Sequence, residues 1–149
     1  MAHQVKALVD GVDQFIGIDH HKRRSEVIIK GRDGQVVKRG NIPTSKEALR
    51  HLLGEADGQV RLAIFEAGPR YRPMYRWLGE LVDQMVMANP GRLKIISQTA
   101  YKDDRIDAGK LADLGMLGMV PEAYACTDEA WDRRQLLRQR AALVRMQTA

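Results

Sequence analysis

Four carboxylates stand where the sequence could build a metal site. Asp19 ends the apolar run QFIGID (14–19), and Glu66 ends a second run, QVRLAIFE (59–66). Asp104 and Asp107 lie three residues apart at the start of a predicted helix. Four carboxylates at close range repel one another, and Mg²⁺, which prefers oxygen ligands, relieves that repulsion. Two such ions can stabilise the attacking and leaving oxygens of a phosphoryl displacement, which is the chemistry of a nuclease or strand-transfer enzyme.

The elements that would position these acids alternate between strands and helices. Apolar and β-branched runs predict strands over 14–19, 25–30, 35–39, 59–66 and 84–88. Apolar residues at helical spacing predict helices over 44–55, 71–83, 103–119 and 127–146, with 91–102 basic and irregular. Thr44, followed by Glu47, is the expected N-cap of the first helix. The fold class is therefore α/β, a mixed sheet in the order βββαβαβα flanked by helices, plus a C-terminal basic helix.

This order brings the acids towards one edge of the sheet. Ligands of such sheets gather at the carboxyl ends of the strands, so neighbouring first and fourth strands would place Asp19 beside Glu66. Asp104 and Asp107 share a helical stripe with Leu111 and Leu114, and we expect the leucines to turn this stripe towards the sheet. A structural alternative stays open, because strand-end acids are common in loops and the helix dipole favours Asp in a first turn.

Basic residues flank the acidic segments and could hold a phosphate backbone. An ordinary solvated charged surface is the alternative. His20 is expected to be exposed or packed, because adjacent residues of a strand face opposite sides, whereas His21 is expected near the acids. The candidate nucleic-acid contacts are His21, Lys22, Arg23, Arg24, Arg70, Lys102 and Arg105.

Composition excludes several other classes of protein. The 149 residues are 44% hydrophobic and 29% charged, which is an ordinary folded composition. A lone cysteine, Cys126, excludes disulfide frameworks, and no apolar run reaches the roughly 20 residues that span a bilayer. We therefore expect a cytoplasmic, nucleoid-associated protein with no membrane partner. The division expected is a catalytic domain over 1–120, followed by the start of a helical segment over 121–149.

The C-terminal segment carries most of the net charge of +5. Residues 131–149 hold five arginines and one aspartate, or +4, which leaves +1 for the rest of the chain. Leu136 and Leu143, and Leu137 and Val144, recur at seven residues, a spacing typical of a coiled coil. We expect this helix to form a homo-oligomer, to present a basic face to nucleic acid, and to continue in a longer parent protein.

A series of short motifs covers residues 14–114 in order. They are Gly17-Ile18-Asp19, His21-Lys22, Phe65-Glu66-Ala67, Tyr71, Asn89-Pro90, Lys102, Asp104-Arg105, Asp107-Ala108 and Leu111-Ala112-Asp113-Leu114. In these motifs the chain resembles the N-terminal domain of the DEDD-motif insertion-sequence transposases, the family that includes the Piv-like DNA invertases. Two departures are an Asp at position 103, where the family more often has a small polar residue, and a shifted glycine in the loop after Glu66.

This resemblance implies a ribonuclease H-like, RuvC-like fold and a DNA substrate. It also implies that Asp19, Glu66, Asp104 and Asp107 are catalytic metal ligands, for two Mg²⁺ or Mn²⁺ ions. Family members are roughly twice as long, carry a C-terminal domain with a catalytic serine, and in some cases use a structured guide RNA. Nothing in this chain matches the serine domain, so we expect that the chain alone does not complete recombination.

Three other functions are alternatives to a DNA recombinase domain. A nuclease of the Holliday-junction resolvase kind could use the same acids. A non-catalytic module that binds nucleic acid and mediates assembly would not need them. Sugar-kinase and actin-like ATPases need a glycine-rich phosphate turn after the first acid, and residues 20–30 contain no glycine, which argues against nucleotide binding.

Overall fold

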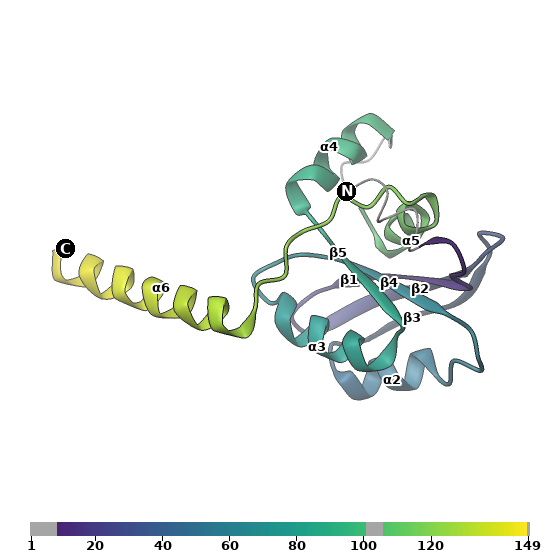
Figure 1. Ribbon diagram of the computed structural model, residues 1–149, viewed down its shortest axis with the longest axis horizontal. Coiled ribbons are helices and arrows are strands. Elements are labelled where there is room, and N and C mark those ends of the chain that lie inside the picture. Colours follow the sequence, from purple (N-terminus) through teal and green to yellow (C-terminus); the bar gives the residue numbers. More distant parts are fainter. Residues whose placement is uncertain (1–8, 101–105, 149) are drawn as a thin grey trace.

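A five-stranded mixed sheet forms the centre of the structure, a computed structural model that describes residues 9–100 and 106–148 (Figure 1). The strand order is β3-β2-β1-β4-β5. The bounds are β1 (Gln14–His20), β2 (Arg24–Gly31), β3 (Val36–Pro43), β4 (Arg61–Glu66) and β5 (Gln84–Ala88). β1, β2 and β3 form an antiparallel meander, whereas β4 and β5 run parallel to β1. The predicted strands and the mixed sheet are therefore confirmed.

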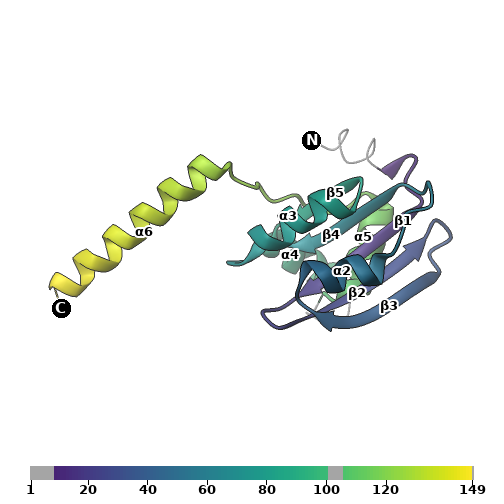
Figure 2. The same ribbon diagram turned by 90° about the horizontal axis from the view of Figure 1, so that it is seen from below.

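Helices cover both faces of this sheet (Figures 1 and 2). Alternation along β1 divides the core, because Ile16 and Ile18 belong to one buried cluster and Phe15 to the other. The first cluster includes residues of α2 (Lys46–Leu53) and α3 (Tyr71–Leu81). The second includes residues of α4 (Pro90–Ala100) and α5 (Ala108–Leu117). The second cluster lies on the face of the sheet that carries the acids.

Within residues 91–100 helix α4 corrects the expectation of irregular structure, and it adds an element that the order βββαβαβα lacks. The strand predicted over 84–88 ends just before Asn89-Pro90. These two residues also begin a helix, because proline suits a first helical position and the Asn89 side chain accepts a hydrogen bond from the Arg92 amide at 3.2 Å. The start of α2 also differs from the prediction by one residue, because its N-cap is Ser45 rather than Thr44.

Helix α5 begins later than expected, at Ala108 instead of near residue 103. Asp107 is its N-cap, and the carboxylate accepts a hydrogen bond from the Lys110 amide at 2.9 Å. The helix ends at Gly118, where φ is 65°, a left-handed conformation that glycine adopts without a steric penalty. Asp107 therefore lies just outside the first turn in which the sequence placed it.

A buried arginine ties the start of β4 to the end of α2. Arg61 is only 4% exposed, and its guanidinium donates to the backbone carbonyls of Leu53, Gly54 and Glu55 at 2.6–3.0 Å. It also donates to the Gln14 side chain at 3.1 Å. Carbonyls at a helix C-terminus have no partner within the helix, so Arg61 satisfies groups that would otherwise be buried without one.

The last helix, α6 (Asp128–Thr148), extends away from the sheet in both views (Figures 1 and 2). Its first turn contacts α3, where the Trp131 ring lies 5.8 Å from the Tyr71 ring and 4.7 Å from the Arg72 guanidinium. Asp128 pairs with Arg72 and Arg76. The rest of α6 buries no residue. Within the described residues, no helix is long and apolar enough to cross a membrane.

Candidate active site

Two of the predicted acids lie side by side at the carboxyl edge of the sheet. The parallel register of β1 and β4 pairs Gln14 with Arg61 and continues to Ile18 with Phe65. The next residues along the two strands are Asp19 and Glu66. Neighbours in register point to the same face of a sheet. The expected adjacency of the first and fourth strands is confirmed, and it places these two carboxylates together.

The environment of this pair disfavours a negative charge on Glu66. Partial burial raises the pKa of the Glu66 carboxyl above its ordinary value, and the nearby charge of Asp19 raises it further, whereas His20 opposes the shift. His21 also contacts Asp19, with its Nε2 atom 3.4 Å from the Asp19 Oδ1 atom. A cation held between Asp19 and Glu66 would relieve the repulsion between them.

The close approach of α5 to β1 fixes the place of the third acid, Asp107. A Cβ atom added to Gly17 would lie 1.8 Å from the carbonyl oxygen of Ala108, so only glycine permits this packing. Gly17 precedes Asp19 by two residues and therefore shares its face of the sheet. Asp107 immediately precedes Ala108, and the contact holds the N-terminus of α5 on the face that carries Asp19.

The helical stripe predicted from the sequence is partly confirmed. Leu111 and Leu114 are buried against the sheet, at 1% and 2% exposure. Asp104, Lys102 and Arg105 lie outside the described residues, so convergence of all four acids stays a prediction. Within residues 9–100 and 106–148, no three His, Cys, Asp or Glu side chains come close enough together to hold a metal ion.

The donor set that is described nevertheless fits Mg²⁺. This ion keeps several waters and is usually held by one or two carboxylates together with substrate phosphate oxygens. Asp19 and Glu66 supply two carboxylates from neighbouring strands of the sheet. Partial burial and the charge of Asp19 both destabilise the negative charge on Glu66, and a bound cation would offset this.

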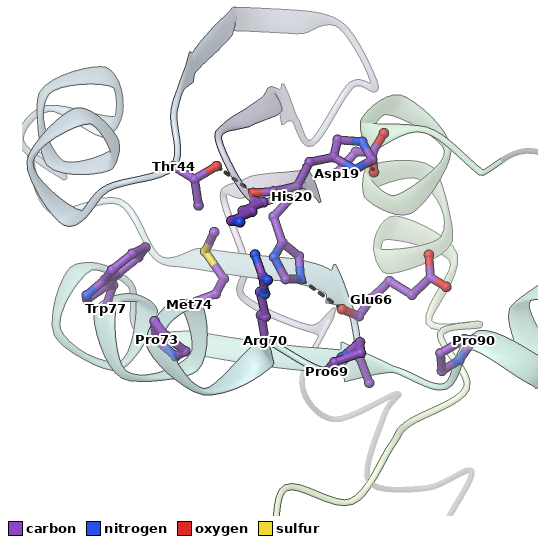
Figure 3. Close-up of a pocket in the computed structure, with 14 residues that line it drawn as sticks. Asp19, His20, Thr44, Glu66, Pro69, Arg70, Pro73, Met74, Trp77 and Pro90 are labelled. Atoms are coloured by element: carbon purple, nitrogen blue, oxygen red, sulfur yellow. Dashed lines mark hydrogen bonds and ion pairs between the residues drawn. The ribbon is translucent and has the colours of Figure 1, made fainter.

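A groove of about 740 Å³ begins at these two acids and extends towards α3 (Figure 3). Its cationic lining residues are Lys22 and Arg70, and its apolar end is formed by α3. Thr44 forms part of the wall and donates a hydrogen bond to the His21 carbonyl at 2.8 Å. The full lining is Asp19, His20, His21, Lys22, Thr44, Glu66, Ala67, Gly68, Pro69, Arg70, Pro73, Met74, Trp77 and Pro90.

The predicted basic residues divide by their surroundings. His21, Lys22 and Arg70 line the groove, and His21 is 63% exposed. Arg24 is instead bound to the Asn41 side chain and carbonyl across β2 and β3, at 2.7 and 2.6 Å. Arg23 is exposed in the β1–β2 turn.

His20 packs as expected. Its ring meets the Phe65 ring edge-on at 5.7 Å, and its Nε2 atom lies 3.1 Å from the Glu66 carbonyl. The sequence missed Thr44 and Trp77 as groove residues. The sequence predicts Trp77 as a packing residue, and Trp77 does pack against the first buried cluster. A signal for its place in the groove is its position seven residues after Arg70, the N-cap of α3.

Comparison with protein families identifies the chain. A sequence model of the IS110-type DEDD transposases, described as a transposase, matches residues 16–149. The chain belongs to this DEDD transposase family. Membership confirms the resemblance carried by the sequence motifs and supports a DNA transposase function, with DNA as the partner.

Other comparisons add little about function. No curated protein matches the chain. One solved structure with some similarity is component A of (R)-2-hydroxyglutaryl-CoA dehydratase from Acidaminococcus fermentans, with 14% identity and a TM-score of 0.38. The alignment covers 59% of this chain and 36% of that one. This likeness is too weak to carry an argument.

Proposed function

We propose that this DEDD transposase chain is a divalent-metal-dependent catalytic domain that cleaves and transfers DNA strands. The observation that carries the proposal is the placement of Asp19 beside Glu66 at the carboxyl ends of two parallel strands. The Asp107 end of α5 packs on the same face. The order β3-β2-β1-β4-β5, with an antiparallel meander joined to two parallel strands, supports a ribonuclease H-like, RuvC-like fold for the domain.

In this proposal Asp19 and Glu66, together with Asp104 and Asp107, hold two Mg²⁺ or Mn²⁺ ions. The ions, when bound, supply positive charge to the phosphate that reacts. The chain itself supplies position: the β1–β4 register fixes Asp19 and Glu66, and the Gly17–Ala108 contact fixes the start of α5.

In this proposal the basic side chains beside the acids position the DNA backbone. Lys22 and Arg70 line the groove that begins at Asp19 and Glu66, and His21 is exposed next to Asp19. Contacts of this kind position a phosphate backbone without reading its sequence, and they weaken as salt rises.

Metal binding by matched variants tests the proposal. We would titrate Mn²⁺ into the chain by calorimetry, with and without a short DNA duplex, beside Asp19→Asn, Glu66→Gln and Asp107→Asn. The matched control is Asp113→Asn, a carboxylate of α5 that pairs with Lys30 at 2.6 Å and lies about 9 Å along the helix from Asp107. Saturable binding that is lost in the three site variants and kept in the control supports the proposal. Equal binding in all five proteins contradicts it.

Two alternatives give different results. A junction-resolving nuclease would need the same acids but would cleave a four-way junction in preference to a linear duplex. A non-catalytic assembly module would bind nucleic acid, show no metal-dependent cleavage, and be unaffected by loss of the acids.

Assembly and a guide RNA belong to the same proposal. Leu136, Leu137, Leu143 and Val144 are 45–66% exposed on α6, and their seven-residue spacing fits a seam between two copies of the helix. Sedimentation of the wild type beside Leu136→Glu/Leu143→Glu tests the seam, and a monomeric wild type would refute it. A structured RNA that binds with saturation in competition with DNA would support a guide.

A further inference from the structure

The groove beside the acids is larger and more apolar than a phosphate contact requires. In Figure 3 the carboxylates of Asp19 and Glu66 lie at one end, near α5, and Trp77 lies at the other. Met74 and Pro73 lie near Trp77 on α3. A paired duplex presents sugars and phosphates and keeps the faces of its bases stacked inside, so it would make little use of such an apolar end.

We infer that this groove binds one or two unpaired nucleotides of the DNA strand next to the phosphate that reacts. This inference rests on the proposed function, because it places the reacting phosphate at Asp19 and Glu66. It adds that the domain takes locally unpaired DNA, with the bases directed towards α3 and the backbone held near Lys22 and Arg70.

The dimensions fit this ligand. The volume of about 740 Å³ lies within the range of about 300–1,000 Å³ typical of pockets that bind small organic ligands. Arg70 and Trp77 are seven residues apart, which is about 10 Å along a helix. Successive nucleotides of a stacked strand rise about 3.4 Å, so the groove is long enough for two of them with room for the sugars.

The chemistry of the lining fits as well. Arg70 lies between the acids and the apolar end (Figure 3), and Lys22 adds a second positive charge to the lining, so the phosphates of the bound nucleotides would lie beside these two residues. The Trp77 ring is half-buried, which holds it in place while leaving a surface on which a base can stack. His20 adds a fixed wall, since its ring contacts Phe65 and its Nε2 atom lies within hydrogen-bonding distance of the Glu66 carbonyl.

Fluorescence anisotropy on three labelled DNAs of one sequence tests the inference. They are a fully paired duplex, the same duplex with two central unpaired nucleotides, and that second DNA with the two unpaired bases removed to leave abasic sites. We expect the unpaired DNA to bind about 5- to 100-fold more tightly than the duplex, as stacking of a base on an aromatic ring predicts. The abasic DNA should lose most of this preference, because it keeps the flexible backbone and lacks the bases.

Variants locate the preference in the groove. Trp77→Leu keeps an apolar side chain against the core and removes the stacking surface, so it should bind all three DNAs about equally. The matched control is Trp131→Leu, since Trp131 packs on Tyr71 and is absent from the groove lining. It should keep the preference. The abasic comparison on the wild type needs no variant, so the inference remains testable if Trp77→Leu fails to fold.

The measurements are made in EDTA, which separates this inference from metal-dependent cleavage. Equal affinity of the wild type for the paired and unpaired DNAs, or a preference that survives abasic substitution, overturns the groove inference and leaves the proposed function standing. A preference for unpaired bases in EDTA, combined with no cleavage in a separate assay with Mn²⁺, would support the groove inference and contradict the proposed function.

Discussion

Replacing Gly17 by alanine should displace the N-terminus of α5 from the sheet. An alanine Cβ would lie 1.8 Å from the Ala108 carbonyl oxygen and 2.8 Å from the Ala112 amide nitrogen. Both neighbours are backbone atoms, so no side-chain rotation relieves the clash. Separating Cβ from the oxygen to at least 3.0 Å moves α5 by 1.2 Å or more.

Two effects of different size should follow. Overpacking of this kind costs about 1–3 kcal/mol of folding free energy, which lowers the melting temperature by about 2–12 °C in a chain of this length. Under the proposed function Asp107 is a catalytic group, and the loss of activity should then be larger, because a displacement of about 1 Å in such a group can cost on the order of 100-fold in rate. Asp107, which caps α5, moves with the helix.

Gly115→Ala provides the matched control. Gly115 also packs α5 on the sheet, but an added Cβ would meet the Ile64 side chain at 2.5 Å, and that side chain can rotate. Alanine also favours a helix over glycine by about 0.5–1 kcal/mol, which offsets part of the crowding. Melting curves, Mn²⁺ titration and DNA cleavage would be compared across the three proteins. Wild-type metal affinity and cleavage in Gly17→Ala would refute the positioning role. Equal damage in Gly115→Ala would show that tight packing in general, not the placement of Asp107, explains the loss.

Three further variants probe separate contacts. Glu66→Gln should raise the melting temperature of the metal-free chain at pH 7. Because the pKa of Glu66 is raised in the folded state, the stability of the wild type falls as pH rises from the ordinary glutamate pKa of about 4.3 towards the folded pKa. The stability gained by Glu66→Gln should therefore disappear below about pH 4. An equal gain at pH 4 and pH 7 would contradict this prediction. Arg61→Met should lower the free energy of unfolding, measured in denaturant melts, by at least about 3 kcal/mol, since it leaves three carbonyls without their donor. The control Arg39→Met, at an exposed position, should change it by no more than about 0.5 kcal/mol. Equal effects of the two variants would contradict the role of these hydrogen bonds. Trp131→Ala should release the start of α6 and speed proteolysis between Gly118 and Thr127. Asp128→Asn should do so more weakly, because the Asp128 carboxylate that pairs with Arg72 and Arg76 is exposed to solvent. Unchanged digestion of both variants would argue against anchoring by α3.

The sheet was predictable because its signals are local. Short apolar runs bounded by turns predicted all five strands, and β5 was predicted with its observed bounds, 84–88. The adjacency of Asp19 and Glu66 followed from the same pattern, since acids that end neighbouring parallel strands meet at one edge.

The helical region after β5 was predicted less well, for physical reasons. Asn89-Pro90-Gly91 suits the end of a strand and the beginning of a helix equally. The hydrogen bonds that distinguish them, which Asn89 accepts from the Arg92 and Leu93 amides, are visible only in the folded structure. Asp107 was expected inside a first turn, where the helix dipole also favours acids, but an N-cap position satisfies the same preference. The groove was missed because its wall combines Thr44 with residues of α3, and no sequence spacing relates the two.

The acids are positioned by two independent structural features. Hydrogen bonds between β1 and β4 place Asp19 beside Glu66, and this arrangement does not depend on α5. Asp107 is held on the same face of the sheet by the docking of α5, which requires the absence of a side chain at Gly17. Under the proposed function Asp107 helps Asp19 and Glu66 to hold the metal, so the metal would bind more tightly in the docked state and by linkage would stabilise the docking. The Mn²⁺-induced rise in melting temperature should accordingly be smaller in Gly17→Ala than in Gly115→Ala.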